Sequence, residues 1–191
     1  WRSGTDTMYN DRRIDWSYVY IKIEVSAMSA HESFKLTKDG YSYSSKTLSG
    51  NSNMTLYSGS LSSGEYELTY VGNYKANLFA GRRTFTYKYR FEVDTTIPTY
   101  TLKAGGSTVS SGSYTNKQIV YTASDKNFDA IRYKRPTSST YNTTYATSYT
   151  VPATDANNGK WYFYARDDME NTSTTVNVYL DTVKPVGKVK S

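Results

Sequence analysis

A strand-like segment that ends in Asp-Thr-X-X-Pro occurs twice in this chain and divides it into parts of one size. Residues 91–98 read Phe-Glu-Val-Asp-Thr-Thr-Ile-Pro, and residues 178–185 read Val-Tyr-Leu-Asp-Thr-Val-Lys-Pro. The two prolines lie 87 positions apart, which is close to the length of one small β-sandwich. This spacing predicts two consecutive domains that end in the same short linker.

A second alignment supports the repeat without using the linkers. Residues 54–68 align without a gap on residues 149–163, at a constant offset of 95 positions. The alignment pairs a glycine, an aromatic and an apolar position: Gly64 with Gly159, Tyr66 with Trp161, and Leu68 with Phe163. A gapless match of three such different residue types is difficult to explain by composition alone.

The two offsets together set the predicted domain boundaries. Because the offset falls from 95 to 87 before the linkers, the first copy has 8 additional residues, which we place in a longer loop near residues 72–83. We therefore expect a divergent first domain over residues 1–94 and a second domain over residues 95–181. Residues 182–191 would form the next linker and the start of a truncated third repeat.

The pattern of apolar residues predicts strands throughout. In residues 160–166 the side chains alternate, which places Trp161, Phe163 and Ala165 in the core and Lys160, Tyr162, Tyr164 and Arg166 outside. Tyrosine is unusually abundant, with 21 copies, and aromatic residues favour strands. No segment has a helical period. The sequence therefore predicts an all-β chain of two antiparallel sandwiches, with about seven short strands in each.

Composition excludes several classes of function. The chain has no cysteine, so it has no disulfide, no cysteine-based zinc site and no thiol nucleophile. No apolar run approaches 18 residues, so we expect no membrane insertion. The net charge is +6, and basic and acidic residues are interspersed within both predicted domains. Nucleic-acid binding needs clustered basic residues, and we do not expect it.

Two short motifs resemble bacterial immunoglobulin-like (Ig-like) domains. The Gly-X-aromatic-X-apolar pattern of residues 64–68 and 159–163 resembles the corner before the sixth strand of Ig domains, with Leu68 and Phe163 at the cysteine position. Residues 165–173, with Asp167 and Asn171, resemble a hairpin of bacterial Ig-like domains, which the first domain lacks. The resemblance implies tandem Ig-like modules of exported or cell-surface proteins, especially of Gram-positive bacteria.

The function that this resemblance implies is structural. We expect a non-catalytic extracellular spacer, with adhesion as an added role, that is a piece of a larger secreted or surface protein. Its partners would be the neighbouring domains and a host or cell-wall glycan or protein ligand. We expect no catalytic residue, no cofactor and no metal ligand. Two alternatives remain open: a carbohydrate-binding module that uses exposed aromatic residues, and the accessory domains of a secreted hydrolase.

Few residues could carry chemistry. His31 is the only histidine and would have to serve any Ser-His-acid triad, but its surroundings favour a solvated loop. A calcium site could use four acidic residues, although Asx turns explain them better. These residues are Asp125, Asp167, Asp168 and Glu170.

Other surface features have simple explanations as well. Trp1, Trp16 and outward tyrosines could stack on sugar rings, but outward tyrosines also stabilise strand pairs. Glycosylation-type triplets begin at Asn53, Asn142 and Asn171, as expected by accident in a chain rich in Ser and Thr. A buried Lys–Asn isopeptide bond cannot be assigned to any pair from the sequence.

Overall fold

The structure is a computed structural model that describes residues 7–14, 18–23, 29–50, 52 and 54–184. The chain separates between Thr95 and Thr96 into two compact units. In the described part, every regular element is a strand except one 3-10 turn, η1 (Asp155–Asn157). The predicted all-β fold is therefore confirmed. Within those described ranges, no helix has the length and apolar character to cross a membrane.

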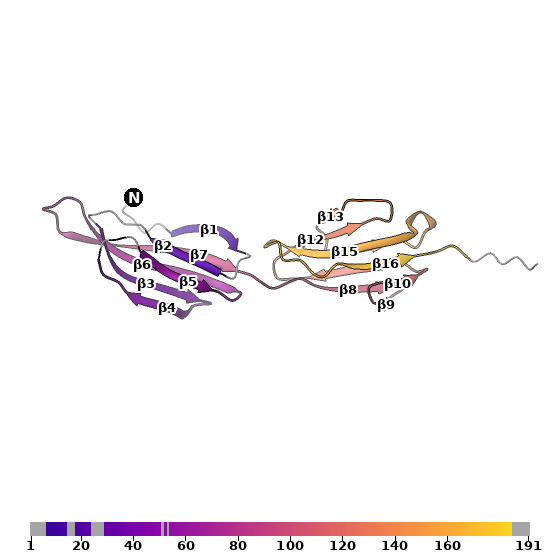
Figure 1. Cartoon of the computed structure of the whole chain (residues 1–191), viewed down its shortest axis with the longest axis horizontal. Coiled ribbons are helices and arrows are strands. Elements are labelled where there is room, and N and C mark those ends of the chain that lie inside the picture. Colours follow the sequence, from indigo (N-terminus) through magenta and orange to yellow (C-terminus); the bar gives the residue numbers. More distant parts are fainter. Residues whose placement is uncertain (1–6, 15–17, 24–28, 51, 53, 185–191) are drawn as a thin grey trace, which may run out of the picture. The chain divides into compact units, whose positions relative to one another are not determined.

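The first unit contains a five-stranded sheet and a two-stranded sheet (Figure 1). The larger sheet has the order β1-β7-β6-β3-β4, and the smaller one pairs β2 with β5. The strands are β1 (Thr7–Ile14), β2 (Tyr18–Ile23), β3 (Ser29–Lys38), β4 (Tyr41–Thr47), β5 (Met54–Ser60), β6 (Gly64–Lys75) and β7 (Arg82–Val93). All pairs are antiparallel except β1 with β7, which is parallel.

The core of the first unit comes from alternate positions of its strands. In β6 the residues Tyr66, Leu68 and Tyr70 are buried, as the sequence predicts. They pack with Phe34, Leu36, Leu56, Leu61, Phe91 and Val93. Burial of these side chains, which come from β3, β5, β6, β7 and Leu61, supplies most of the stabilisation of such a unit.

The second unit is a sandwich of a five-stranded and a four-stranded sheet, with the orders β10-β16-β15-β12-β13 and β14-β11-β8-β9. The longer strands are β8 (Thr99–Ala104), β11 (Ile119–Ser124), β12 (Phe128–Lys134), β14 (Ser148–Val151), β15 (Gly159–Asp167) and β16 (Val176–Leu180). The three shortest are β9 (Ser107–Thr108), β10 (Ser113–Thr115) and β13 (Asn142–Thr144). Pairing is antiparallel except for β10 with β16.

The two sheets of the second unit enclose one core. Trp161 is 3% exposed, so its predicted burial is confirmed, and Phe163 and Ala165 on the same strand are fully buried. They pack against Leu102, Ile119, Tyr121, Ala123, Ile131, Val151, Val176, Val178 and Leu180.

Two sequence predictions differ from the structure in detail, and a third is not tested by it. The second unit has nine described strands rather than about seven, because three short strands extend the sheet edges. The additional residues of the first unit do not form only a loop: β6 and β7 extend through most of 72–83, which leaves a loop of residues 76–81. The two strands pair as far as Lys75 and Arg82, so the backbone N–H and C=O groups of this longer hairpin find their partners within it. The predicted third-repeat stub, residues 186–191, lies outside the described residues.

Candidate functional site

His31 lies on a buried strand and not in a solvated loop. It belongs to β3 and is 3% exposed, so the predicted loop position is wrong. Its Nε2 lies 2.6 Å from the carbonyl oxygen of Ser52, and its Nδ1 lies 2.9 Å from the Tyr70 hydroxyl. Because a carbonyl can only accept, Nε2 carries a proton, and in the neutral imidazole Nδ1 then accepts the hydrogen bond that the Tyr70 hydroxyl donates.

These two contacts decide what His31 can do. A general base needs a ring nitrogen that can receive a proton from a nucleophile within hydrogen-bond reach. Both ring nitrogens of His31 already have partners, and neither partner is a serine hydroxyl or a carboxylate. The arrangement fastens β3 to β6 and to the segment at Ser52, and it is not that of a Ser-His-acid triad.

Asp167 organises the hairpin that follows β15. Its Oδ1 accepts hydrogen bonds from the backbone N–H groups of Met169 and Asn171, at 2.9 and 2.8 Å. Its Oδ2 accepts a third from the Asn171 side chain at 2.8 Å. Glu170 between them has a positive φ of 65°. The Asx-turn interpretation of this segment is therefore confirmed for Asp167. Its carboxylate accepts hydrogen bonds from backbone N–H groups that the tight turn leaves without a backbone acceptor.

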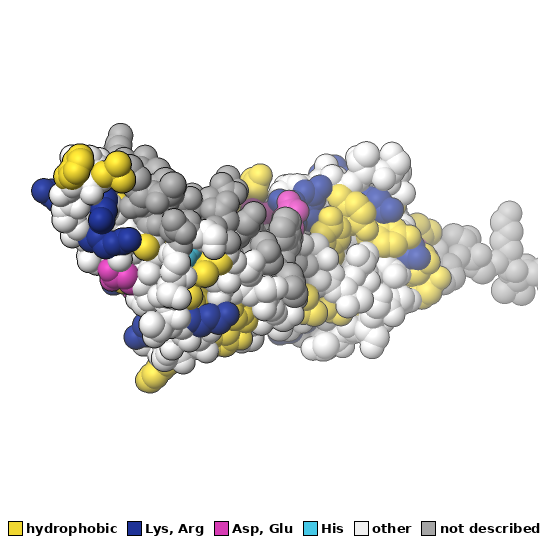
Figure 2. Space-filling view, turned by 60° about the vertical axis from the view of Figure 1, so that its left-hand side comes forward, with side chains coloured by type: hydrophobic (Ala, Val, Ile, Leu, Met, Phe, Trp, Pro, Cys, Tyr) yellow, Lys and Arg dark blue, Asp and Glu magenta, His cyan; other side chains and the backbone are white. Residues whose placement is uncertain are grey.

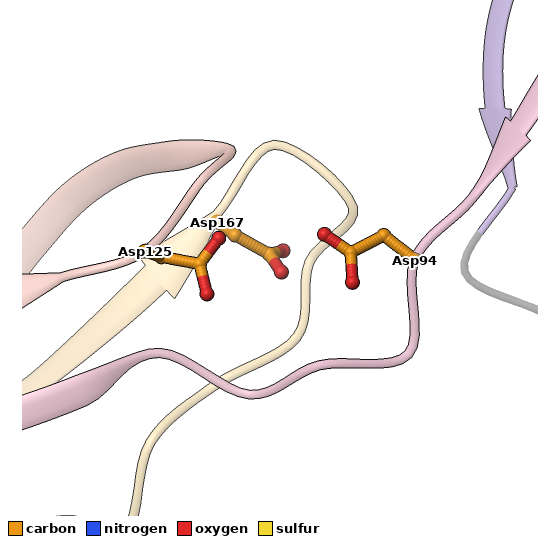
Figure 3. Close-up of side chains that lie close together, drawn as sticks. All are labelled: Asp94, Asp125 and Asp167. Carbon is orange, nitrogen blue, oxygen red and sulfur yellow. The ribbon is translucent and has the colours of Figure 1, made fainter. Parts of the chain in front are cut away.

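Asp125 places a second carboxylate beside Asp167. Asp125 follows β11, and Figure 3 shows its side chain close to that of Asp167, with oxygen atoms of the two carboxylates within 4.8 Å. Burial is the main cause that raises the pKa of Asp167 above its ordinary 3.8, and the charge of Asp125 raises it further. The hydrogen bonds that the hairpin donates to the carboxylate act in the opposite direction and lower this pKa. Asp125 itself accepts a hydrogen bond from the Asn127 backbone at 2.8 Å.

These carboxylates form only part of what a metal ion needs. Asp125 and Asp167 could each give an oxygen to a cation, whereas calcium takes six to eight oxygen ligands. Asp168 and Glu170 have exposed side chains on the hairpin. Asp94, which Figure 3 also labels, is the residue directly after β7 of the first unit. The pair within the second unit is thus a structural feature of the hairpin and carries no metal assignment.

The outer face of the five-stranded sheet carries a row of tyrosine and lysine side chains. Its members come from β10, β16, β15 and β12 and from the residue before β13. We call it the Tyr–Lys row, and it consists of Tyr114, Tyr179, Lys160, Tyr162, Lys134, Tyr141 and Tyr164. Figure 2 shows hydrophobic and basic side chains lying side by side on the visible face of the second unit.

Contacts between the rings and the ammonium groups hold the row together. The Nζ atom of Lys134 lies 4.3 Å from the centre of the Tyr162 ring and 5.4 Å from that of Tyr141. The Nζ atom of Lys160 lies 4.9 Å from Tyr162 and 5.0 Å from Tyr179. In such cation–π contacts the positive charge is attracted to the negative face of the ring. At one end Tyr114 stacks on Tyr179, with ring centres 4.4 Å apart.

The charge of this face is positive. The five strands of the sheet contain only two acidic residues, Asp129 and Asp167. Asp129 pairs with Arg166, and the Oδ2 atom of Asp129 lies 2.6 Å from the Nη2 atom of Arg166. Asp167 is buried in its hairpin. A third cation, Arg132, lies on β12 next to the row and has a buried Nε atom without a hydrogen-bond partner. Lys134, Lys160 and Arg132 thus face no carboxylate on this sheet.

A second exposed feature is the tip of the β6–β7 hairpin. Leu78 and Phe79 are 80% and 98% exposed there. Asn77 fixes the turn, because its Oδ1 accepts hydrogen bonds from the backbone N–H groups of Phe79 and Ala80, at 3.0 and 2.8 Å. Two apolar side chains form a small patch, and nothing in the structure shows what covers them.

Some of the remaining residues named in the sequence analysis lie outside the described ranges, and others lie within them. Trp1, Trp16 and Asn53 lie outside the described residues. Asn142 is exposed on β13, whereas Asn171 is engaged by Asp167. Sequence analysis placed Lys160, Tyr162 and Tyr164 on the outer face, but it missed the row, because cross-strand neighbours depend on the register.

Comparison with known proteins gives fold likeness only. No protein-family description matches the chain, and no curated protein matches it either. Among solved structures, fibronectin(III)-like modules of Clostridium thermocellum CbhA align over 99% of this chain and 100% of theirs, at 16% identity and a TM-score of 0.40. The amphioxus IgVJ-C2 molecule aligns over 91% and 100%, at 17% identity and a TM-score of 0.41. Likeness at this level identifies no function.

Proposed function

We propose that this chain is a non-catalytic structural segment of a larger exported bacterial protein, in which two Ig-like units space or present other domains. The supporting observation is how the two units use their aligned residues. Tyr66 and Trp161, and likewise Leu68 and Phe163, are buried in the cores of their units. The polar groups of His31 and Asp167 are used to fasten strands and turns. These residues serve the fold, as expected of a spacer.

A replacement experiment in the source organism tests this role. The segment is exchanged for two unrelated β-sandwich domains of equal length, and in a second strain it is deleted. An epitope tag on the neighbouring domain is then probed with antibody on intact cells. A spacer predicts full labelling after replacement and reduced labelling after deletion. Labelling only after cell lysis in the parent strain would contradict export, and loss of labelling after replacement would contradict a spacer role.

A further inference from the structure

The Tyr–Lys row is an outer sheet face of half-buried side chains with an exposed Tyr114 at one end, and it has more organisation than a solvated surface needs. A long charged side chain on a surface normally lays its stem on apolar neighbours and keeps its charged head in water. Here each ammonium group lies between two rings: Lys160 between Tyr179 and Tyr162, and Lys134 between Tyr162 and Tyr141. The register explains this order, because Lys160 is the direct partner of Tyr179 and Lys134 is the direct partner of Tyr162.

We propose that the Tyr–Lys row binds an acidic polysaccharide. The row crosses the sheet in the direction perpendicular to the strands, over roughly 20 Å at the usual strand spacing. It presents two positioned ammonium groups and the hydroxyls of five tyrosines, and the partly buried Arg132 side chain lies beside them. Carboxylate or sulfate groups of the polymer bind the cations through charge-assisted hydrogen bonds, and its hydroxyls bond the phenols.

The charges favour a polyanion over a neutral sugar chain. Lys134, Lys160 and Arg132 face no carboxylate on this sheet, because Asp129 is paired with Arg166 and Asp167 is buried in its hairpin. A neutral polymer would supply no opposite charge to these cations and would gain only from ring contacts. An anionic polymer supplies the missing charges, and complementary charge also speeds association.

The covered rings argue against a nucleic acid. Single-stranded nucleic acids bind through bases that stack on open aromatic faces. Tyr162 carries two ammonium groups close to its ring, and Tyr179 is stacked on Tyr114 and contacted by Lys160. The row therefore offers charges and hydroxyls rather than stacking platforms.

The lysines at the centre of the row argue against a protein partner. The cores of protein–protein interfaces are depleted of lysine. In this row, lysines lie at its centre and tyrosines at both ends. A lysine-centred face with hydroxyls along it suits a hydrated polymer better than a packed protein surface.

The inference rests on the proposed exported role, where such polymers are encountered, but it is tested separately with the purified full chain. Polygalacturonate is titrated into the protein by calorimetry, with neutral dextran and single-stranded DNA as comparison polymers. We expect polygalacturonate to bind, and dextran and DNA to bind much more weakly. No binding of polygalacturonate, equal binding of dextran, or tighter binding of DNA would overturn the proposal. Any of these results would leave the replacement test of the spacer role unaffected.

Two variants place the site on the row. Replacing both row lysines, K134Q with K160Q, should weaken binding about tenfold because two positioned charges are lost. The control, K103Q with K117Q, removes two exposed lysines of the same unit away from the row and should change affinity less than about twofold. Equal losses in both pairs would show attraction to net charge alone and would overturn the site.

A third variant separates positioned charge from charge in general. Tyr162→Ala keeps the net charge and removes the ring that both lysines contact. We expect severalfold weaker binding, whereas Tyr145→Ala, at a 75% exposed tyrosine outside the row, should bind as the parent does. Thermal unfolding of each variant confirms the fold, and unchanged affinity in a folded Tyr162→Ala protein would contradict the proposal.

Discussion

Tyr66 and Trp161, which lie 95 positions apart, each donate a hydrogen bond from the ring to the backbone carbonyl four residues earlier. The Tyr66 hydroxyl reaches Ser62, and the Trp161 indole N–H reaches Asn157, both at 2.8 Å. Both rings are buried. Two different aromatic side chains therefore do the same work: each fills the core and fastens the turn that precedes its strand.

This shared contact predicts that two substitutions of Trp161 lower the free energy of unfolding by different amounts. Trp161→Phe keeps the ring in the core and loses the indole hydrogen bond, so it should lower the free energy of unfolding of the second unit by about 1–2 kcal/mol. Trp161→Ala also empties a large volume and should cost about 3–5 kcal/mol. Denaturant unfolding followed by circular dichroism measures both. An unchanged stability in Trp161→Phe would contradict the contribution of the hydrogen bond, and equal losses in the two variants would contradict a separate contribution from packing.

The glycines at the start of the same strands should respond unequally to alanine. Gly159 has a φ of 120°, and a Cβ there would lie 2.6 Å from the rigid ring of Pro136. Gly64 has a φ of 155°, and its Cβ would meet the flexible end of Lys38. We expect Gly159→Ala to cost about 2–3 kcal/mol and Gly64→Ala about 1 kcal/mol.

Gly81→Ala is the control for this pair, since a Cβ at Gly81 has open space around it. It should leave the melting temperature within about 1 °C. A Gly64→Ala variant less stable than Gly159→Ala would show that the side chain of Lys38 cannot move aside.

The buried bond between His31 and Tyr70 predicts a measurable coupling. His31→Ala leaves the Tyr70 hydroxyl without its acceptor, and Tyr70→Phe removes that hydroxyl. The loss in the double variant should therefore be smaller than the sum of the single losses, by about 1 kcal/mol. A double-mutant cycle from denaturant unfolding gives this number, and strict additivity would contradict the hydrogen bond.

The neighbouring carboxylates predict a pH-dependent effect of Asp125→Asn. The pKa of Asp167 is raised in the folded state, so its contribution to stability is complete below its ordinary 3.8 and is lost as the pH rises through the raised value. Removing the charge of Asp125 brings this pKa down and reduces the loss. With EDTA present, the variant should melt on the order of 2 °C above the parent at pH 7 and together with it at pH 3.

Asp181→Asn provides the matched control, because it removes one exposed carboxylate after β16 and its amide oxygen can still accept the bond from Val183. It should not reproduce the gain at pH 7. An equal gain in both variants would assign the effect to net charge and not to the contact of Asp125 with Asp167.

Much of the fold followed from the sequence because local patterns determine it. Alternation assigned Trp161, Phe163 and Ala165 to the core, and the 95-residue offset matched Tyr66 with Trp161 before any contact was known. The Asx turn at Asp167 also follows from local spacing, since Asp and Asn lie four residues apart.

The remaining features depend on distant residues. His31 looked like a loop residue because its buried position is created by Tyr70 and Ser52, which lie 39 and 21 positions away. The Tyr–Lys row needs the register of four strands, and a shift of one residue would turn its tyrosines to the other face. Sequence periodicity shows which residues face out, but not which of them meet.

The central claim is that the chain is a spacer of two separately folded, equivalent units, and single-molecule force spectroscopy tests it most directly. The chain is pulled between marker domains of known length. Our account predicts two unfolding events, each releasing about 300 Å of chain for a unit of about 95 residues. Trp161→Ala should lower the force of only one event. A single event that releases both lengths together, or two events weakened alike by Trp161→Ala, would contradict it.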